Sequence, residues 1–169
     1  MKTYVLTLSK VFPSTHAHAG QLTDFKTAFN NARLCAKCQE KPKGMCMGEC
    51  VVGYIKRHTI RANYDLWKKR FEQIAAGEAC LSVRQWTGSP YRTKQVEIAR
   101  LTREDGIGIQ RLDFANLYGC DRYIVDCYDV ALSHLATNDG LSIDDWLEWF
   151  KNYDLSKPLA IIHFTKFRY

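Results

Sequence analysis

The stretch "IKRHTIRANYDLW", residues 55–67, places polar and cationic side chains at the start of a segment with strand character. In a β-strand, alternation puts Thr59 and Arg61 on one face and His58 on the other. Strand parity would also separate Lys56 from Thr59, so the two can act together only if Lys56 sits in a turn before the regular strand. The stretch therefore predicts a strand that presents Thr59 and Arg61, preceded by a turn that carries Lys56.

A helix is predicted directly after this strand. Asn63 is a favourable N-cap, because its short amide side chain can accept a hydrogen bond from the first turn of a helix. Gly77 marks the expected end of the helix. The apolar residues between them recur at helical spacing, and the face that we expect to be buried consists of Leu66, Trp67, Phe71, Ile74 and Ala75. Core packing is therefore a better interpretation of the tryptophan than a platform for a stacked base.

Strands and helices alternate irregularly in the rest of the chain. Period-two patterns predict strands over residues 3–9, 78–86, 93–101, 107–118 and 158–167. Helical patterns predict helices over residues 24–32 and 123–136, and a further one that opens with a Ser142–Asp145 capping box and turns Ile143, Trp146, Leu147 and Phe150 inward. The turn sequence TGSPY predicts a hairpin. Without a regular βαβ order, the pattern favours an α+β domain with a curled, mostly antiparallel sheet or small barrel.

Length and composition are those of one globular domain covering residues 1–169. The 24 basic and 18 acidic side chains leave a formal charge of +6, which mildly favours anionic partners such as RNA or a nucleotide. The N-terminal sequence MKTYVLTLSK is too polar for a secretory signal, and no apolar run approaches the roughly 18 residues that span a bilayer. We therefore expect a cytoplasmic protein with no membrane partner.

A cysteine-rich insertion at residues 35–50 interrupts this pattern. Cys35, Cys38, Cys46 and Cys50 have the spacing C-x2-C-x7-C-x3-C, which can bring four thiolates around one tetrahedral ion. Zinc suits four thiolates best, and four protein ligands leave no open position, so its role would be structural. The alternatives are unligated thiols, or two ligands with two unrelated neighbours. The odd total of seven cysteines favours a reducing compartment over a disulfide framework.

Two further groups of residues have a functional and a structural interpretation. Arg84, Trp86 and Arg92 interleave cationic and aromatic side chains around the hairpin, a pattern suited to single-stranded nucleic acid, although Trp86 fits the core equally well. His16 and His18 lie in a loop, where they could bind a metal or a phosphate, but solvated loop histidines are the simpler interpretation. For His58, on the strand face opposite Thr59, a structural hydrogen bond is the preferred interpretation.

The opening stretch resembles a known motif. Gly53 followed by K-R-H-T-I-R is similar to the G-x-K-x-x-T-x-R signature of the ASCH domains, which belong to the PUA-like β-barrel superfamily. The segments GEACLSVRQW, VEIARL, NDGLSIDDWLEWF and IIHFTKF resemble later parts of the same family in the same order. The resemblance covers most of the chain and implies a small PUA-like barrel with flanking helices. The cysteine-rich insertion is additional to that pattern.

The resemblance also implies candidate site residues. ASCH domains are expected to recognise RNA, nucleotides or modified bases in a cleft, and some small members are amidohydrolases that remove the acetyl group from acetylcytidine with a lysine, a threonine and a glutamate. By motif, these positions fall on Lys56, Thr59 and Asp139. The last is a departure from the family, because aspartate is one methylene shorter than glutamate. Its reach to Lys56 or to a substrate is therefore the point that a structure must decide.

Three functions follow from these residues. The leading expectation is recognition of RNA or a nucleotide in a basic cleft, with Lys56 and Arg61 on a phosphate and with Thr59 and Asp139 on a base edge. The alternative is an amidohydrolase acting on an acylated nucleoside. In that case Lys56, with a pKa lowered by burial and by Arg61, would activate the Thr59 hydroxyl as nucleophile. A third class is a protein-interaction module built on the cysteine-rich insertion.

Overall fold

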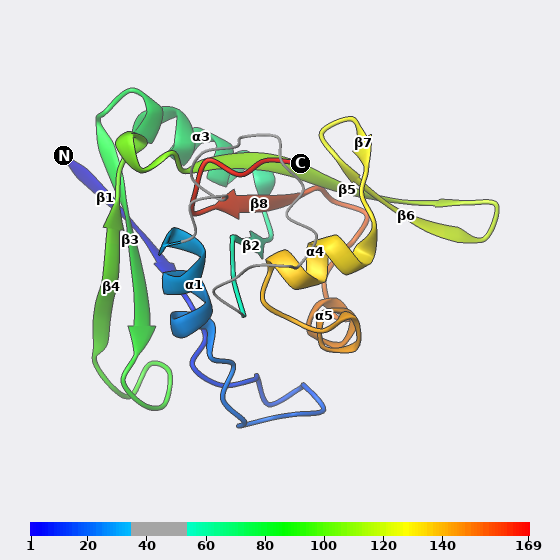
Figure 1. The fold of residues 1–169 in the computed structure, drawn as a ribbon, viewed down its shortest axis with the longest axis horizontal. Coiled ribbons are helices and arrows are strands. Elements are labelled where there is room, and N and C mark those ends of the chain that lie inside the picture. The colour runs from blue at the N-terminus through cyan, green and yellow to red at the C-terminus, as the bar shows by residue number, and fades with distance from the viewer. Residues whose placement is uncertain (35–53) are drawn as a thin grey trace.

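The computed structural model describes residues 1–34 and 54–169, which form an α+β arrangement (Figure 1). The helices of these residues are α1 (Phe25–Leu34), α3 (Tyr64–Ala75), α4 (Leu132–Asn138), α5 (Ile143–Phe150) and the 3-10 helix η1 (Arg103–Asp105). The strands are β1 (Lys2–Thr7), β2 (His58–Arg61), β3 (Ala79–Trp86), β4 (Gln95–Leu101), β5 (Gly108–Leu117), β6 (Cys120–Val125), β7 (Tyr128–Asp129) and β8 (Leu159–His163). The α+β class expected from the irregular order of elements is confirmed.

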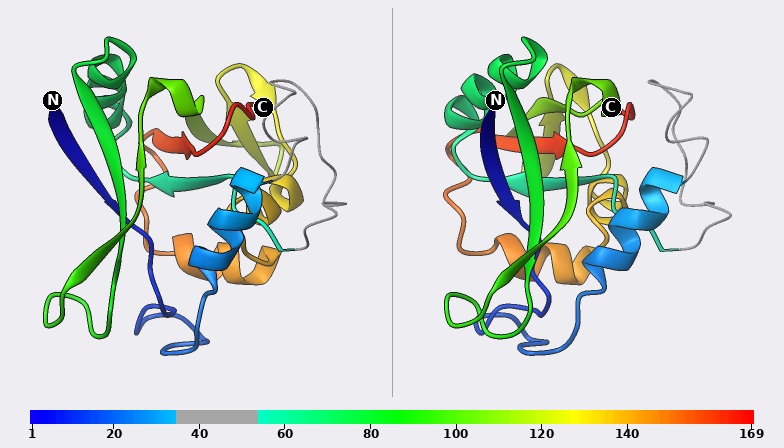
Figure 2. Two further views of the ribbon diagram at one scale, coloured as in Figure 1. Left: turned by 60° about the vertical axis from the view of Figure 1, so that its left-hand side comes forward. Right: turned by 90° about the vertical axis from the view of Figure 1, so that its left-hand side faces the viewer.

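The strands form two sheets. In the three-stranded sheet β1-β3-β4, β1 runs parallel to β3, and β3 and β4 make the antiparallel hairpin expected from the turn sequence. The five-stranded sheet has the order β2-β8-β5-β6-β7, and its neighbouring strands are all antiparallel. Figures 1 and 2 show the two sheets running crosswise, with α3 and α5 on opposite sides of β2 and β8.

A closed barrel is not formed by the described strands. No pairing joins the β1-β3-β4 sheet to the β2-β8-β5-β6-β7 sheet among residues 1–34 and 54–169. The curled, mostly antiparallel arrangement agrees with the sequence pattern. The finer assignment to a PUA-like barrel remains a prediction.

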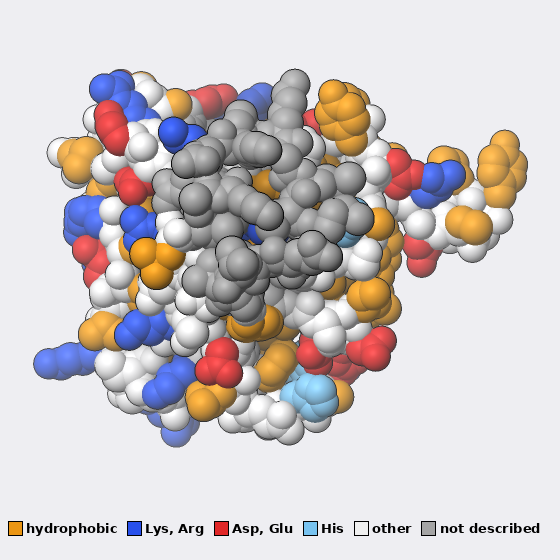
Figure 3. All heavy atoms as spheres, in the orientation of Figure 1, with side chains coloured by type: hydrophobic (Ala, Val, Ile, Leu, Met, Phe, Trp, Pro, Cys, Tyr) orange, Lys and Arg blue, Asp and Glu red, His pale blue; other side chains and the backbone are white. Residues whose placement is uncertain are grey.

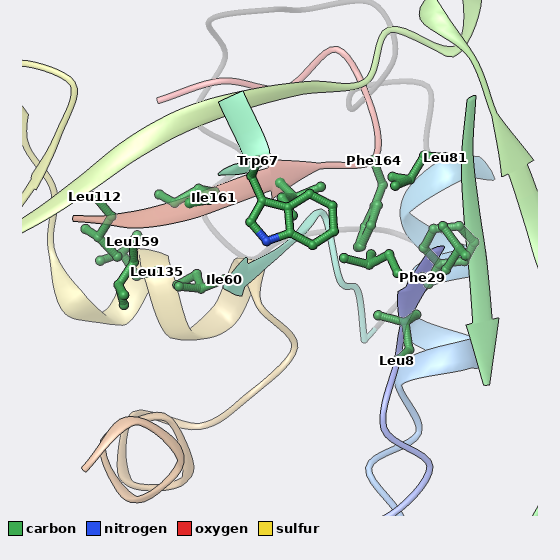
Figure 4. Close-up of a cluster of buried hydrophobic side chains, with 14 of the residues drawn as sticks. Leu8, Phe29, Ile60, Trp67, Leu81, Leu112, Leu135, Leu159, Ile161 and Phe164 are labelled. Atoms are coloured by element: carbon green, nitrogen blue, oxygen red, sulfur yellow. The ribbon is translucent and has the colours of Figure 1, made fainter. Parts of the chain in front are cut away.

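One apolar core lies between the sheets and their helices. Figure 4 shows Trp67 reaching from α3 into this core, between Ile161 of β8 and Phe164 in that view. Trp67 is only 7% exposed, so its assignment to the core is confirmed. The central strand β8 is buried along its whole length, because it has neighbouring strands on both edges and helices nearby. It forms the rigid base from which β2 and the candidate site are positioned.

Two details of the sequence-based prediction are wrong. The helix expected over residues 123–136 is mostly strand and turn, because β6 and β7 form a hairpin around a turn in which Asp126 has a φ of 54°; only α4 is helical. The buried helix faces are also narrower than the apolar patterns. Leu66 and Ala75 of α3 and Ile143 and Leu147 of α5 are exposed. Each helix touches the core only along a narrow stripe, so apolar residues at the margin of the pattern remain in water.

Within the described residues, no helix combines the length and the apolar character needed to cross a bilayer.

Candidate active site

Lys56 lies in the short segment 54–57 before β2, and backbone hydrogen bonds fix the position of this segment. The backbone N–H of Lys56 donates to the carbonyl of Ala28 in α1 at 2.9 Å, and the N–H of Arg57 donates to the carbonyl of Asn138 in α4 at 2.8 Å. The carbonyl of Arg57 in turn accepts from the N–H of Phe164 at 2.9 Å. Hydrogen bonds to α1, to α4 and to Phe164 therefore hold the segment in place. Lys56 precedes the first residue of β2, so the alternation of strand side chains does not fix its direction, as the sequence predicts.

Lys56 and Asp139 form a buried ion pair. The Lys56 ammonium donates to Oδ1 of Asp139 and to the backbone carbonyl of the same residue. It also lies 4.0 Å from the ring centroid of Phe25, a cation–π contact. Lys56 is 1% exposed and Asp139 is 3% exposed. The shorter aspartate therefore does reach the lysine, because its position at the C-terminus of α4 brings the backbone itself next to the ammonium.

Gly140 permits this close approach. Its φ of 73° lies in the left-handed region, and a Cβ at this position would come 3.3 Å from the Cβ of Lys56. The Gly140 carbonyl accepts a hydrogen bond from the hydroxyl of Tyr54. Burial, reinforced by the charge of Asp139, raises the pKa of Tyr54 to about 12, so this hydroxyl remains a donor. The turn after α4 is thus held against the segment that carries Lys56.

Thr59 and Arg61 project from the same face of β2, as strand parity predicts. Nη1 of Arg61 donates to Oγ1 of Thr59 at 2.9 Å, and Nη2 donates to the carbonyl of Thr7 at 2.7 Å. The guanidinium uses Nη1 again for the carbonyl of Ile60, also at 2.9 Å. A cationic donor on Oγ1 stabilises negative charge on that oxygen and leaves the Thr59 proton free to be given up. Arg61 is therefore arranged to polarise the threonine hydroxyl.

These side chains surround one small cavity. Its volume is about 10 Å³, which is room for about one water molecule. Its walls are Ser9, Phe25, Lys56, Thr59, Arg61, Asp139, Leu141, Trp149 and Phe150. A larger groove of about 320 Å³ adjoins it, since Ser9 lines both. The walls of the groove are Thr7, Ser9, Lys10, Val11, Trp86, Gly88, Pro90, Tyr91 and Gln95.

Burial sets the protonation states of the site. It lowers the pKa of Lys56 to about 8; the adjacent Asp139 carboxylate opposes this shift, and the charge of Arg61 adds to it. Burial raises the pKa of Asp139 above its usual value, against the opposing effect of Lys56 and Arg61. The pKa of Arg61 is also lowered by burial. A lysine with a pKa of about 8 that lines the same small cavity as a threonine hydroxyl is an arrangement suited to proton transfer.

The other predicted binding residues lie on the β3–β4 hairpin. Arg84 is half-buried and donates from Nε to Oγ of Ser82 at 2.8 Å, so part of its donor capacity is used within the sheet. Trp86 is half-buried and its ring packs against Tyr91 with centroids 5.4 Å apart. Arg92 is exposed. Of this set, Trp86 lines the groove beside the cavity, whereas Arg84 and Arg92 line neither space.

His58 lies on the opposite face of β2. Its Nε2 is 2.8 Å from the hydroxyl of Tyr169, and burial holds its pKa well below the ordinary value. The structural hydrogen bond predicted for His58 is confirmed. His16, by contrast, is buried against α5 and is not the solvated loop histidine that the sequence favours.

Five walls of the cavity were not predicted to belong to the site: Ser9, Phe25, Leu141, Trp149 and Phe150. Ser9 ends the strand predicted over residues 3–9, Phe25 lies in the helix predicted over residues 24–32, and Phe150 is on the predicted inward face of the late helix. No role was predicted for Leu141 or Trp149. No pattern signals that α1, α5 and the end of β1 meet above Lys56. The predicted zinc ligands Cys35, Cys38, Cys46 and Cys50 lie outside the residues that the structure describes.

Comparison with known proteins finds no relative: no protein-family model, curated protein or solved structure matches the chain. The candidate site therefore stands on the residues and contacts described above.

Proposed function

We propose that this protein is an amidohydrolase that removes the acyl group from an acylated nucleoside such as acetylcytidine. One observation carries the proposal: Lys56, with a pKa near 8, is paired with Asp139 in the same cavity as the polarised hydroxyl of Thr59. A lysine needs a lowered pKa to act as a base near neutral pH, and a threonine needs such a base to act as a nucleophile.

The residues supply each step of the reaction. The neutral amine of Lys56 takes the proton of Thr59 as Oγ1 attacks the acyl carbonyl carbon. Arg61, which donates to Oγ1, stabilises the negative charge that develops on this oxygen as the proton leaves. The C–N bond then breaks, and the Lys56 ammonium, held by Asp139, returns the proton to the leaving amine. A water molecule, deprotonated by Lys56, hydrolyses the acyl–threonine ester to release the carboxylic acid and restore Thr59.

The adjoining groove supports a nucleoside as the substrate. Its volume of about 320 Å³ is at the lower end of small-molecule pockets, and Trp86 and Tyr91 offer aromatic faces on which a base can stack. The acyl group would then point past Ser9 toward the cavity. An acetyl group is larger than one water molecule, so the cavity must widen when the substrate enters. The resemblance to ASCH domains and the PUA-like barrel it implies agree with this substrate class.

Recognition of RNA or a nucleotide is the second candidate. It is favoured by the exposed Arg92 next to the Trp86–Tyr91 pair and by the formal charge of +6. The buried site supports it less well. Lys56 is enclosed and paired with Asp139, and Arg61 donates to backbone carbonyls and to Thr59, so neither cation is presented to a phosphate.

The zinc ion at the four clustered cysteines and the cytoplasmic location remain predictions. Metal analysis tests the first: the expected content is about one equivalent held by these thiolates, and chelation should lower the stability of the protein. A content below about half an equivalent, with no loss of stability on chelation, would contradict it.

The decisive experiment uses two variants of Thr59. Thr59→Val keeps the shape of the side chain but removes the hydroxyl, so release of cytidine and acetate from acetylcytidine should stop. Thr59→Ser restores a hydroxyl and should recover part of the turnover. Circular dichroism on both variants checks the fold. If the wild-type protein releases no acetate, or if Thr59→Val turns over acetylcytidine like the wild type, the proposed mechanism is wrong.

A further inference from the structure

A second group of chemically active side chains lies outside the candidate active site, between the loop after β1 and the start of α5. The loop folds back on itself through a bridge between Val11 and Leu22, which brings His16 and His18 against α5. Asp145, in the first turn of α5, faces both histidines. On the surface, a histidine adjoins acidic side chains in the lower right of Figure 3.

The side-chain atoms of this group are close enough to share one ion. Nδ1 of His18 lies 3.0 Å from Oδ1 of Asp145, and Nε2 of His16 lies 3.8 Å from the same oxygen. All three ligand atoms lie within 4.8 Å of one another. In a tetrahedral zinc site with bonds of about 2.0–2.1 Å, neighbouring ligand atoms are roughly 3.3 Å apart. The separations of the two histidine nitrogens from Oδ1, 3.0 and 3.8 Å, bracket that value.

The Asp145 carboxylate is already oriented for this purpose. The hydroxyl of Ser142 donates to Oδ2 of Asp145 at 2.8 Å, and the N–H of Asp145 donates to the same hydroxyl oxygen at 3.1 Å. Oδ1 is left to the histidines. A hydrogen bond to the second oxygen of a metal-binding carboxylate is a common way to fix its direction. The N-cap serine of α5 therefore also orients a ligand.

We propose that His16, His18 and Asp145 bind a divalent transition-metal ion of the zinc class. Two imidazole nitrogens and one carboxylate oxygen suit Zn²⁺, Co²⁺ or Ni²⁺, whereas Mg²⁺ and Ca²⁺ prefer ligand sets made of oxygen alone. Three protein ligands leave a fourth position for water. This site is independent of the cysteine cluster and of the proposed hydrolysis.

Metal binding would move the proton of the neutral His16 ring from one nitrogen to the other. The N–H of His18 approaches Nδ1 of His16 at 3.1 Å, and Nε2 of His16 faces the backbone carbonyl of Asp145 at 3.1 Å. In the neutral ring this arrangement places the proton on Nε2. An ion at Nε2 requires the proton on Nδ1, so the amide of His18 must give up its acceptor. The amide signal of His18 in a nuclear magnetic resonance spectrum should therefore move on metal addition.

The ion would restrict the movement of two aromatic residues that line the candidate active site, Trp149 and Phe25. The ring of Trp149 in α5 contacts His16, with centroids 6.0 Å apart, and Phe25, with centroids 5.6 Å apart. Phe25 in turn lies over the ammonium of Lys56. An ion joining the loop to α5 would hold these rings in place, which gives the metal a stabilising role and requires no part in the chemistry.

The test compares metal content between matched variants of the full chain. Each protein is dialysed against Zn²⁺ near neutral pH and its bound zinc is measured by elemental analysis. His18→Ala and Asp145→Asn should bind one equivalent less than the wild type. The controls are His134→Ala, a histidine outside the group, and Asp144→Asn, the neighbouring carboxylate in the same turn of α5. Both should bind as much as the wild type. Zinc held by the cysteines cancels in these differences.

Thermal unfolding gives a second measurement on the same proteins. When the free zinc concentration is a hundred times the Kd of the proposed site, zinc should raise the Tm of the wild type by about 5 °C more than the Tm of His18→Ala. The side chain of His18 is half exposed, so this variant should fold normally. Equal zinc content in the wild type and His18→Ala overturns the proposal. Loss of the same equivalent in Asp144→Asn also overturns it, because that carboxylate is not in the group.

Discussion

The Lys56 cavity and the adjoining β3–β4 groove hold cationic and aromatic side chains in two opposite settings. In the cavity, Lys56 and Asp139 are almost completely buried and in contact with each other. Beside the groove, Arg92 is exposed, and Trp86 is half-buried with one aromatic neighbour. The sequence predicts that both regions take part in one binding cleft.

This difference in burial determines what the charges of each region can contribute to binding or catalysis. Charges in a protein interior interact strongly and shift one another's pKa, so the cavity can move protons. Exposed charges are screened by water and salt, so they steer and hold a ligand but are poor catalysts. In the proposed hydrolysis, bond breaking would therefore belong to the cavity and substrate affinity to the groove. The following predictions separate the two roles.

The largest effect is expected for Lys56→Met, which fills the same space without a base. Turnover of acetylcytidine should fall by about a thousandfold, the typical contribution of a positioned general base. The measurement is kcat/KM with the fold checked by circular dichroism. Lys69→Met, at an exposed position of α3, serves as the control and should retain full activity. Activity within tenfold of the wild type would remove Lys56 from the mechanism.

Asp139→Asn should lower the free energy of unfolding by about 3 kcal/mol at neutral pH, because it leaves the buried Lys56 without its anionic partner. Urea denaturation measures the change, and Asp144→Asn, which is exposed, should stay within about 0.5 kcal/mol of the wild type.

The folded-state pKa of Lys56 is below its unfolded value of 10.5, so protonation of Lys56 opposes folding below about pH 8, and this opposition fades as the pH rises to 10.5. Without Asp139 the folded-state pKa of Lys56 falls below about 8, so the variant sheds the lysine proton at a lower pH than the wild type. The difference in stability between the two proteins should therefore shrink as the pH rises toward 8 and stay constant above it, and a difference that does not change below pH 8 would contradict the assignment.

The pH dependence of wild-type turnover should follow the neutral form of Lys56. With a pKa of about 8, kcat/KM should rise about fiftyfold between pH 6 and 8 and then level off. In Asp139→Asn, the residual activity should titrate at lower pH, because the Asp139 charge no longer holds the lysine pKa up. Initial rates across a buffer series measure both profiles. A profile that is flat from pH 6 to 9 is incompatible with Lys56 as the base.

Trp86→Ala should weaken substrate binding and spare the chemistry. Loss of one stacking partner should raise KM for acetylcytidine about tenfold, with kcat changed by less than about twofold. Steady-state kinetics separates the two parameters. Tyr118→Ala, at the fully exposed tip of the β5–β6 hairpin, is the aromatic control. A fall in kcat with unchanged KM would show that the groove does not hold the substrate as proposed.

The smallest effect is expected for Arg92→Ala. If the groove also receives RNA, the variant should bind a short single strand a few-fold more weakly, and the slope of log affinity against log salt should fall by about one. Fluorescence anisotropy at several salt concentrations measures this. Turnover of the uncharged nucleoside should not change. An unchanged salt slope would exclude Arg92 from a phosphate contact.

Local patterns account well for the elements that carry the site. Alternation placed Thr59 and Arg61 on one face of β2, and helical spacing placed Trp67, Phe71 and Ile74 in the core. The N-cap at Ser142 was also predictable, although the reciprocal backbone bond of a full capping box is not formed. The hairpin of β6 and β7 was not, because a short apolar run can satisfy either period and only its pairing with β5 selects the strand.

The sequence by itself determined which residue types stand near β2 and on which face they lie, because side-chain direction in a strand follows from backbone geometry alone. The tertiary structure decided that Lys56 and Asp139 meet across 83 residues of chain, that Gly140 lets them do so, and that Phe25 and Trp149 cover them. It also decided that His16 and His18 face Asp145. These contacts depend on how α1, α5 and β8 pack, and the resulting burial, which no local pattern encodes, is what lowers the pKa of the lysine.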